Sequence, residues 1–129
     1  MTPADTLRAA VDRLRELADA APEPPWTEDG VGDIGFGVAM GGGRGVDTGD
    51  DGPDGRAVAQ YIAAMHPGVG NALAAWLEAA ARYYEAGVTA AADVFRDDPA
   101  GRDRFLTTGP GAPSPHAIAV ARQILGSTA

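Results

Sequence analysis

Apolar side chains recur every three or four residues over most of this sequence, a spacing that predicts amphipathic helices. The first such segment spans residues 3–21, and its apolar positions are Leu7, Val11, Leu14, Leu17, Ala18 and Ala21. Thr2 is placed to cap this helix, with Pro3 at its first position and Asp5 where the acid of a capping box belongs. We expect the apolar stripe to pack against a neighbouring helix, because such a face must be covered.

Residues 26–54 have a different composition, rich in glycine and aspartate. Three apolar residues in this segment alternate with other residues at the period of a strand: Ile34, Phe36 and Val38. A second short run at 45–48 follows the Gly41–Gly43 turn, so we predict a two-stranded β ribbon and, after it, an acidic loop. A lone hairpin is barely stable in water, and we therefore expect the ribbon to pack on a helix together with Trp26.

Helical spacing resumes after Asp54, a candidate N-cap, and predicts helices over residues 55–66 and 67–96, separated by Pro67. The first has one apolar face, formed by Val58, Tyr61, Ile62 and Met65. The second has a longer stripe, formed by Val69, Leu73, Trp76, Leu77, Ala80, Tyr84, Val88, Ala91 and Phe95. Gly87 is the weak point of this helix.

Residues 102–113 are predicted to be a loop, and a last helix over residues 115–125 is capped by Ser114 and ended by Gly126. The predicted fold class is therefore mainly α (α+β). It is a bundle of about four helices with a small two-stranded β ribbon inserted after the first helix, in a single domain of residues 1–129.

Composition adds an expectation about assembly. Alanine supplies 27 of the 129 residues, whereas aromatic residues make up only 6%. An alanine-rich core buries little area per residue, so the few larger side chains must supply most of the hydrophobic free energy. Because a monomer of this kind has little stability, we expect a homo-oligomer.

The charge composition limits the partners and the compartment. All ten basic residues are arginine, and the net charge is −8. A surface of this sign repels a phosphate backbone, so nucleic acid is not an expected partner. No segment has the roughly 18 consecutive apolar residues of a membrane span, and no signal peptide is visible. We therefore expect a cytoplasmic protein that does not bind membranes.

Each motif that suggests catalysis or a cofactor fails at a particular residue. The glycine run at 35–45 has Met40 where a dinucleotide fingerprint needs its third glycine, and a chain without lysine has no Walker loop. Four aspartates that suggest calcium lack the spacing of an EF-hand, namely Asp47, Asp50, Asp51 and Asp54. Cysteine is absent, and no serine lies in a nucleophile elbow. The sequence therefore predicts no enzyme, no metal site and no cofactor.

Arginine and aromatic side chains are the remaining candidates for a binding surface. We expect Tyr61, Trp76 and Tyr84 to lie in the core, whereas Tyr83 is off the main stripe and is expected to be exposed. The candidate ligand-binding residues are Trp26, Arg44, Arg56, Arg82 and Tyr83.

Three segments together resemble a known family. They are Leu14–Trp26, Ala59–Pro67 with the following Leu73 and Leu77, and Ser114–Gly126. In these segments the chain resembles the Ead-like accessory proteins of phages and prophages, as an actinobacterial or actinophage member. It departs from them at Ala21-Pro-Glu-Pro-Pro-Trp26, where the family has Thr-Pro-Gly-Pro-Trp. The resemblance implies phage origin and an accessory role, and it supplies no catalytic residue.

These observations lead to one functional hypothesis and two alternatives. The first is a non-enzymatic phage- or prophage-type accessory protein in the host cytoplasm that binds a host or phage protein as a homo-oligomer. The alternative is an anti-defence protein that sequesters a small (cyclic) nucleotide between subunits, with Arg44, Arg56 and Arg82 on its phosphates. The second alternative is a small enzyme that uses His66 or His116 with an aspartate as an acid–base pair.

Overall fold

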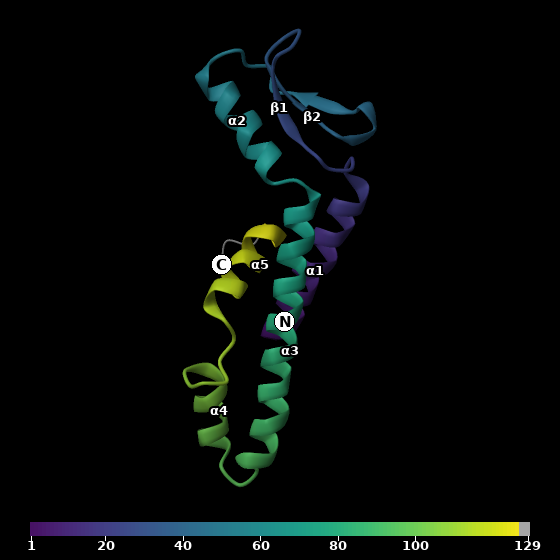
Figure 1. Ribbon diagram of the computed structural model, residues 1–129. Helices are drawn as coiled ribbons and strands as arrows, with labels where there is room; N and C mark the ends of the chain where they lie inside the picture. Colours follow the sequence, from purple (N-terminus) through teal and green to yellow (C-terminus); the bar gives the residue numbers. More distant parts are fainter. Residues whose placement is uncertain (127–129) are drawn as a thin grey trace. The chain divides into compact units, whose positions relative to one another are not determined.

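The computed structural model describes residues 1–126, which form five α-helices, a short 3-10 helix and a three-stranded antiparallel sheet (Figure 1). The helices are α1 (Pro3–Ala20), α2 (Pro53–Ala64), α3 (Pro67–Val94), α4 (Pro99–Thr107) and α5 (Pro115–Leu125). The strands are β1 (Thr27–Val31), β2 (Phe36–Ala39) and β3 (Gly45–Asp47), and the 3-10 helix η1 (Gly41–Gly43) joins β2 to β3. The mainly helical class with a small sheet is confirmed, and the four predicted helices agree with these bounds to within two residues at each end.

Contacts divide the chain into two units. The first consists of Met1–Leu14 and the described residues from Leu73 onward, and the second of Arg15–Ala72. The expectation of a single domain over residues 1–129 stays a prediction, and its last three residues lie outside the described part.

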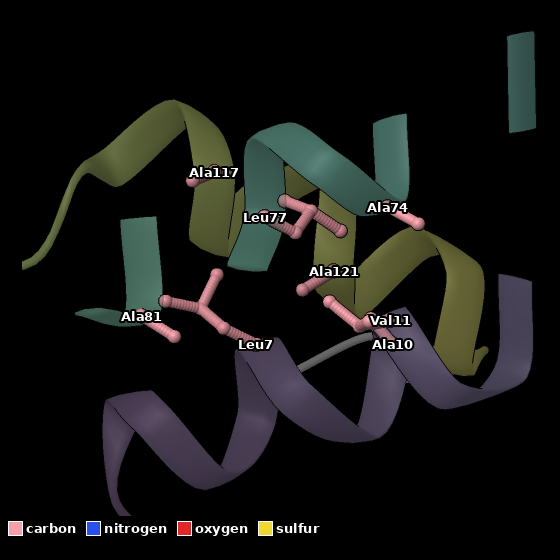
Figure 2. Close-up of a cluster of buried hydrophobic side chains, with 8 residues drawn as sticks. All are labelled: Leu7, Ala10, Val11, Ala74, Leu77, Ala81, Ala117 and Ala121. Carbon is pink, nitrogen blue, oxygen red and sulfur yellow. The ribbon is translucent and has the colours of Figure 1, made fainter. Parts of the chain in front are cut away.

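The core of the first unit is built mostly of alanine. Eight buried side chains from α1, α3 and α5 meet there: Leu7, Ala10, Val11, Ala74, Leu77, Ala81, Ala117 and Ala121 (Figure 2). Leu7, Val11 and Leu77 are the large members, and each is at most 1% exposed. Alanine lets the three helix backbones approach closely, so the few large side chains fill the space between them.

The start of α1 forms the predicted capping box. The Asp5 backbone N–H donates to Thr2 Oγ1 at 3.1 Å, and the Thr2 N–H donates to Asp5 Oδ2 at 3.0 Å. The Thr2 backbone N–H and, to a smaller degree, the Thr2 hydroxyl favour the ionised Asp5 carboxylate, and they lower the pKa of Asp5 below its ordinary value. One turn later Arg8 contacts Glu85 at 2.6 Å and Glu78 at 3.6 Å, which ties α1 to α3.

Thr2→Val is expected to return the pKa of Asp5 part of the way toward its ordinary value, because the hydroxyl is lost while the larger cause, the Thr2 N–H, remains. Since the folded-state pKa is lowered, the stabilisation from this pair is present above the ordinary carboxyl pKa and is lost as the pH falls through the lowered one. NMR titration of the Asp5 side-chain carbon measures the shift. Thr6→Val is the control, because it leaves the Thr2 hydroxyl in place; an equal shift in both variants would contradict the assignment.

A fifth helix, α4, corrects the prediction of a loop over residues 102–113. The Asp98 side chain caps it by accepting from the Gly101 N–H at 3.0 Å, and Pro99 occupies its first turn. The Phe105 ring lies 5.6 Å from that of Phe95, measured between ring centroids. Asp98 and Pro99 follow the end of α3 closely, and together they form the start of α4.

The second unit contains the sheet, with strand order β1-β2-β3 and α2 packed on it. Phe36 and Val38 of β2 are buried with Ala59 of α2, and Trp26, Met40 and Ile62 cover the edges of this cluster. The prediction of two strands is corrected to three, because the polar segment Thr27–Val31 pairs with β2. Ile34 was expected to pack with this cluster but is 71% exposed, since it lies in the turn between β1 and β2.

The Asp50 backbone joins the sheet to α2. Its carbonyl accepts from the Phe36 N–H at 3.0 Å, and its carboxylate accepts from the Gly52 N–H at 2.8 Å. The N-cap of α2 is thus Gly52 rather than the predicted Asp54, which lies in the first turn. Gly35 and Gly55 both approach the Asp50 backbone so closely that a Cβ at either position would overlap it.

Candidate interaction surfaces

The polar side chains of the described residues include two histidines, His66 and His116. None is buried, and no group of three or more histidine, aspartate and glutamate residues lies close enough to hold a metal ion. His66 precedes Pro67 at the start of α3 and caps this helix, since its Nδ1 accepts from the Gly68 N–H at 3.0 Å. His116 is exposed in the first turn of α5, in the other unit, so the proposed acid–base use of either histidine stays a prediction.

The second unit holds Trp26, Arg44 and Arg56 of the five candidate ligand-binding residues. The Trp26 indole Nε1 donates to the Pro22 carbonyl at 2.9 Å, and its ring packs against the Phe36 cluster. The Arg56 guanidinium lies 4.8 Å from the centroid of the Phe36 ring and contacts Glu28 at 3.4 Å. These contacts give Trp26 and Arg56 packing roles within the unit.

Carboxylates adjoin all three arginines of the nucleotide alternative. A shallow pocket beside Arg56 is also lined by Asp51, and the hollow beside Arg44 is lined by Asp29 and Asp47. In the first unit, Arg82 lies 3.4 Å from Glu78. Because neighbouring carboxylates repel a phosphate, these surroundings do not favour a nucleotide, and that alternative stays a prediction.

The fifth candidate, Tyr83, lies on an exposed apolar face of α3. We define the outward α3 face by six exposed residues at helical spacing: Trp76, Ala79, Tyr83, Ala86, Ala90 and Val94. Trp76 is 40% exposed, Tyr83 77% and Val94 73%. The opposite face of the same helix carries the buried Ala74, Leu77, Ala81 and Ala91. α3 is therefore apolar on two opposite faces, of which the chain itself covers one.

Tyr83 is exposed as predicted, whereas the expected core position of Trp76 is wrong. The helical period was assigned correctly, but Trp76 lies at the edge between the buried stripe and the exposed one. Tyr84 is half-buried, which is closer to the expectation.

A second exposed apolar row lies on α2, in the second unit. We call it the α2 ridge and define it by Val58, Tyr61 and Met65, which are 49%, 70% and 46% exposed. The apolar residues of this helix that pack in the cluster on the sheet are instead Ala59, Ile62 and Ala63. The expected core position of Tyr61 is therefore wrong, because alanine and a single isoleucine fill the narrow space above β2.

Charge is divided unequally between the units. Residues 15–72 contain ten carboxylates and three arginines, a net charge of −7. The rest of the chain contains eight carboxylates and seven arginines, a net charge of −1. The outward α3 face thus belongs to a nearly neutral unit and the α2 ridge to a strongly acidic one.

Comparison with known proteins finds no relative of this chain. No protein-family model, curated protein or solved structure matches the chain. The resemblance to Ead-like proteins therefore stays a prediction. Among the described residues, no helix has the length and apolar character that crossing a membrane requires.

Proposed function

We propose that this protein is a non-enzymatic accessory protein that acts by binding other proteins and works as a homo-oligomer. The observation that carries the proposal is the pair of apolar faces on α3. A helix that is apolar on opposite sides is normally covered on both, and the chain covers only the side that carries Leu77. The outward α3 face is the surface that a second copy covers.

Charge and shape both support a second copy as the occupant. The unit that carries α3 has a net charge of −1, so two such units approach without strong repulsion. If two α3 helices lie antiparallel about Tyr83, Trp76 of each falls opposite Ala90 of the other, and Ala79 falls opposite Gly87. The large Trp76 then meets a small residue, and the small pair leaves the backbones room to approach while the two Tyr83 rings meet near the two-fold axis.

The exposed area fits a dimer of modest affinity. At about 200 Å² for an aromatic side chain, Trp76 and Tyr83 expose about 230 Å² together. A stable interface takes about 800 Å² from each partner, so the alanines and Val94 must supply much of the remainder. We therefore expect dissociation in the micromolar range.

Tyr83→Glu is expected to raise the dissociation constant of the dimer at least about tenfold, because two carboxylates would meet near the two-fold axis. Sedimentation equilibrium over a range of protein concentrations measures it. Tyr61→Glu, the same change on the α2 ridge, is the matched control and should leave the dimer intact. A wild-type chain that stays monomeric at every concentration would refute the proposal.

The absence of cysteine allows a direct test of the register. Tyr83→Cys should form a disulfide-linked dimer under mild oxidation, because the two positions adjoin the axis. Thr89→Cys, which is exposed on the same helix but off the outward α3 face, should cross-link much more slowly. Equal cross-linking of the two variants would show random collisions instead of the proposed pairing.

A further inference from the structure

The α2 ridge and the charge of its unit point to a second partner of different chemistry. We infer that the ridge is a docking site for a basic amphipathic protein segment, such as a helix that carries apolar residues on one face and arginine or lysine beside them. This inference goes beyond self-association, since it concerns a different helix and does not depend on α3 pairing.

The geometry of α2 supplies an apolar row with an acidic end. Val58, Tyr61 and Met65 follow one another three and four residues apart, and Asp54 precedes Val58 by one turn on the same side of the helix. Asp51 lies just before the helix and is exposed. The neighbouring exposed residues Ala57 and Ala64 are small, so the three large side chains stand above their surroundings.

The charge of the unit decides between possible occupants. A second copy would bring another unit of charge −7 against this one, and the two would repel. Nucleic acid and anionic lipid are also negatively charged, so this unit would repel them as well. Arg56, the single basic residue of α2, is already held by Glu28 and the Phe36 ring. A partner with positive charge beside an apolar face is therefore the occupant that this surface favours.

Such a partner would bind in the helix-to-surface mode, with apolar residues at helical spacing against the ridge and cations toward Asp51 and Asp54. The apolar contact would supply most of the affinity. The charges would raise the association rate and make it fall with salt, because screening acts over about 8 Å at physiological ionic strength.

A synthetic helical peptide of about 18 residues, with leucine at three- and four-residue spacing and lysine elsewhere, is the probe. Its binding to the full chain is measured by fluorescence anisotropy at low and physiological salt. The peptide with glutamate in place of lysine should bind at least about tenfold more weakly. Tyr61→Ser combined with Met65→Ser should weaken binding of the lysine peptide at least about tenfold as well.

The role of the acidic end is tested by charge-matched variants. Asp51→Asn with Asp54→Asn should weaken binding several-fold and reduce its salt dependence. Asp29→Asn with Asp33→Asn removes the same charge from β1 and the following turn, and should bind like the wild type. Equal losses in the two pairs would mean that overall acidity alone attracts the peptide. Unchanged binding by the Tyr61/Met65 variant, with circular dichroism showing it folded, would also overturn the inference.

Discussion

Leu77→Ala is expected to lower the free energy of unfolding by about 3–5 kcal/mol, near the upper end for such a change. Leu77 is fully buried where α1, α3 and α5 meet. Five of the seven other fully buried side chains of this cluster are alanines, which have no longer side chain to turn into the space left behind (Figure 2). The cavity therefore stays open, and the cavity cost adds to the lost transfer free energy.

Urea unfolding followed by circular dichroism measures this loss, with all variants at the same protein concentration so that the proposed self-association contributes equally to each. Leu125→Ala is the matched control, since Leu125 is 38% exposed in α5 and loses little contact with the core. Leu125→Ala should lower the free energy of unfolding by less than about 1 kcal/mol. Equal losses for the two leucines would contradict the picture of a core held by a few large side chains.

Gly55→Ala is expected to destabilise the second unit by about 3 kcal/mol, although alanine is the better helix former. A Cβ at this position would overlap the carbonyl of Asp50. That carbonyl accepts the Phe36 N–H, so moving it away also weakens the hydrogen bond that joins the loop to β2. The substitution thus disturbs the helix, the loop and the sheet together.

Gly70→Ala is the control for this substitution, because Gly70 is also a helical glycine of the second unit. A Cβ there would lie 3.9 Å from the Cβ of Ala18, an ordinary contact. We expect it to raise stability by up to about 1 kcal/mol through helix propensity alone. Urea unfolding of both variants tests whether the free energy of unfolding falls for Gly55→Ala and rises for Gly70→Ala. A stabilising Gly55→Ala would show that the loop carrying Asp50 is free to move.

The ends of α1 and α5, unlike the N-cap of α2 and the whole of α4, could be predicted because their caps have local signals. Thr2 with Asp5, Ser114 and Gly126 mark their ends in the sequence, and the structure confirms all three. β1 had no such signal. Its residues are mostly polar, and it becomes a strand because it pairs with β2 and brings Glu28 beside Arg56 of α2. A polar strand stabilised by its pairing and by one ion pair shows no apolar alternation in the sequence.

The candidate surfaces could be predicted only in part, for a related reason. In α3 alanine occupies both faces, so helical period alone does not say which face the chain covers. Tyr83 was placed correctly because it is far from the buried stripe, whereas Trp76 at the edge was not. In α2 the larger apolar residues were expected on one face and Tyr61 in the core, but only Ile62 of them packs in the cluster on the sheet.

The alanine core also limits how this protein can change over evolution. At Ala10, Ala74, Ala81, Ala117 and Ala121 the backbones of neighbouring helices approach with room for little more than a methyl group. A larger residue at any of them would have to push two helices apart. Neutral drift at these sites is therefore confined to glycine and serine. The sequence of the first unit is constrained by a maximum side-chain size, a limit that does not apply to the exposed apolar faces.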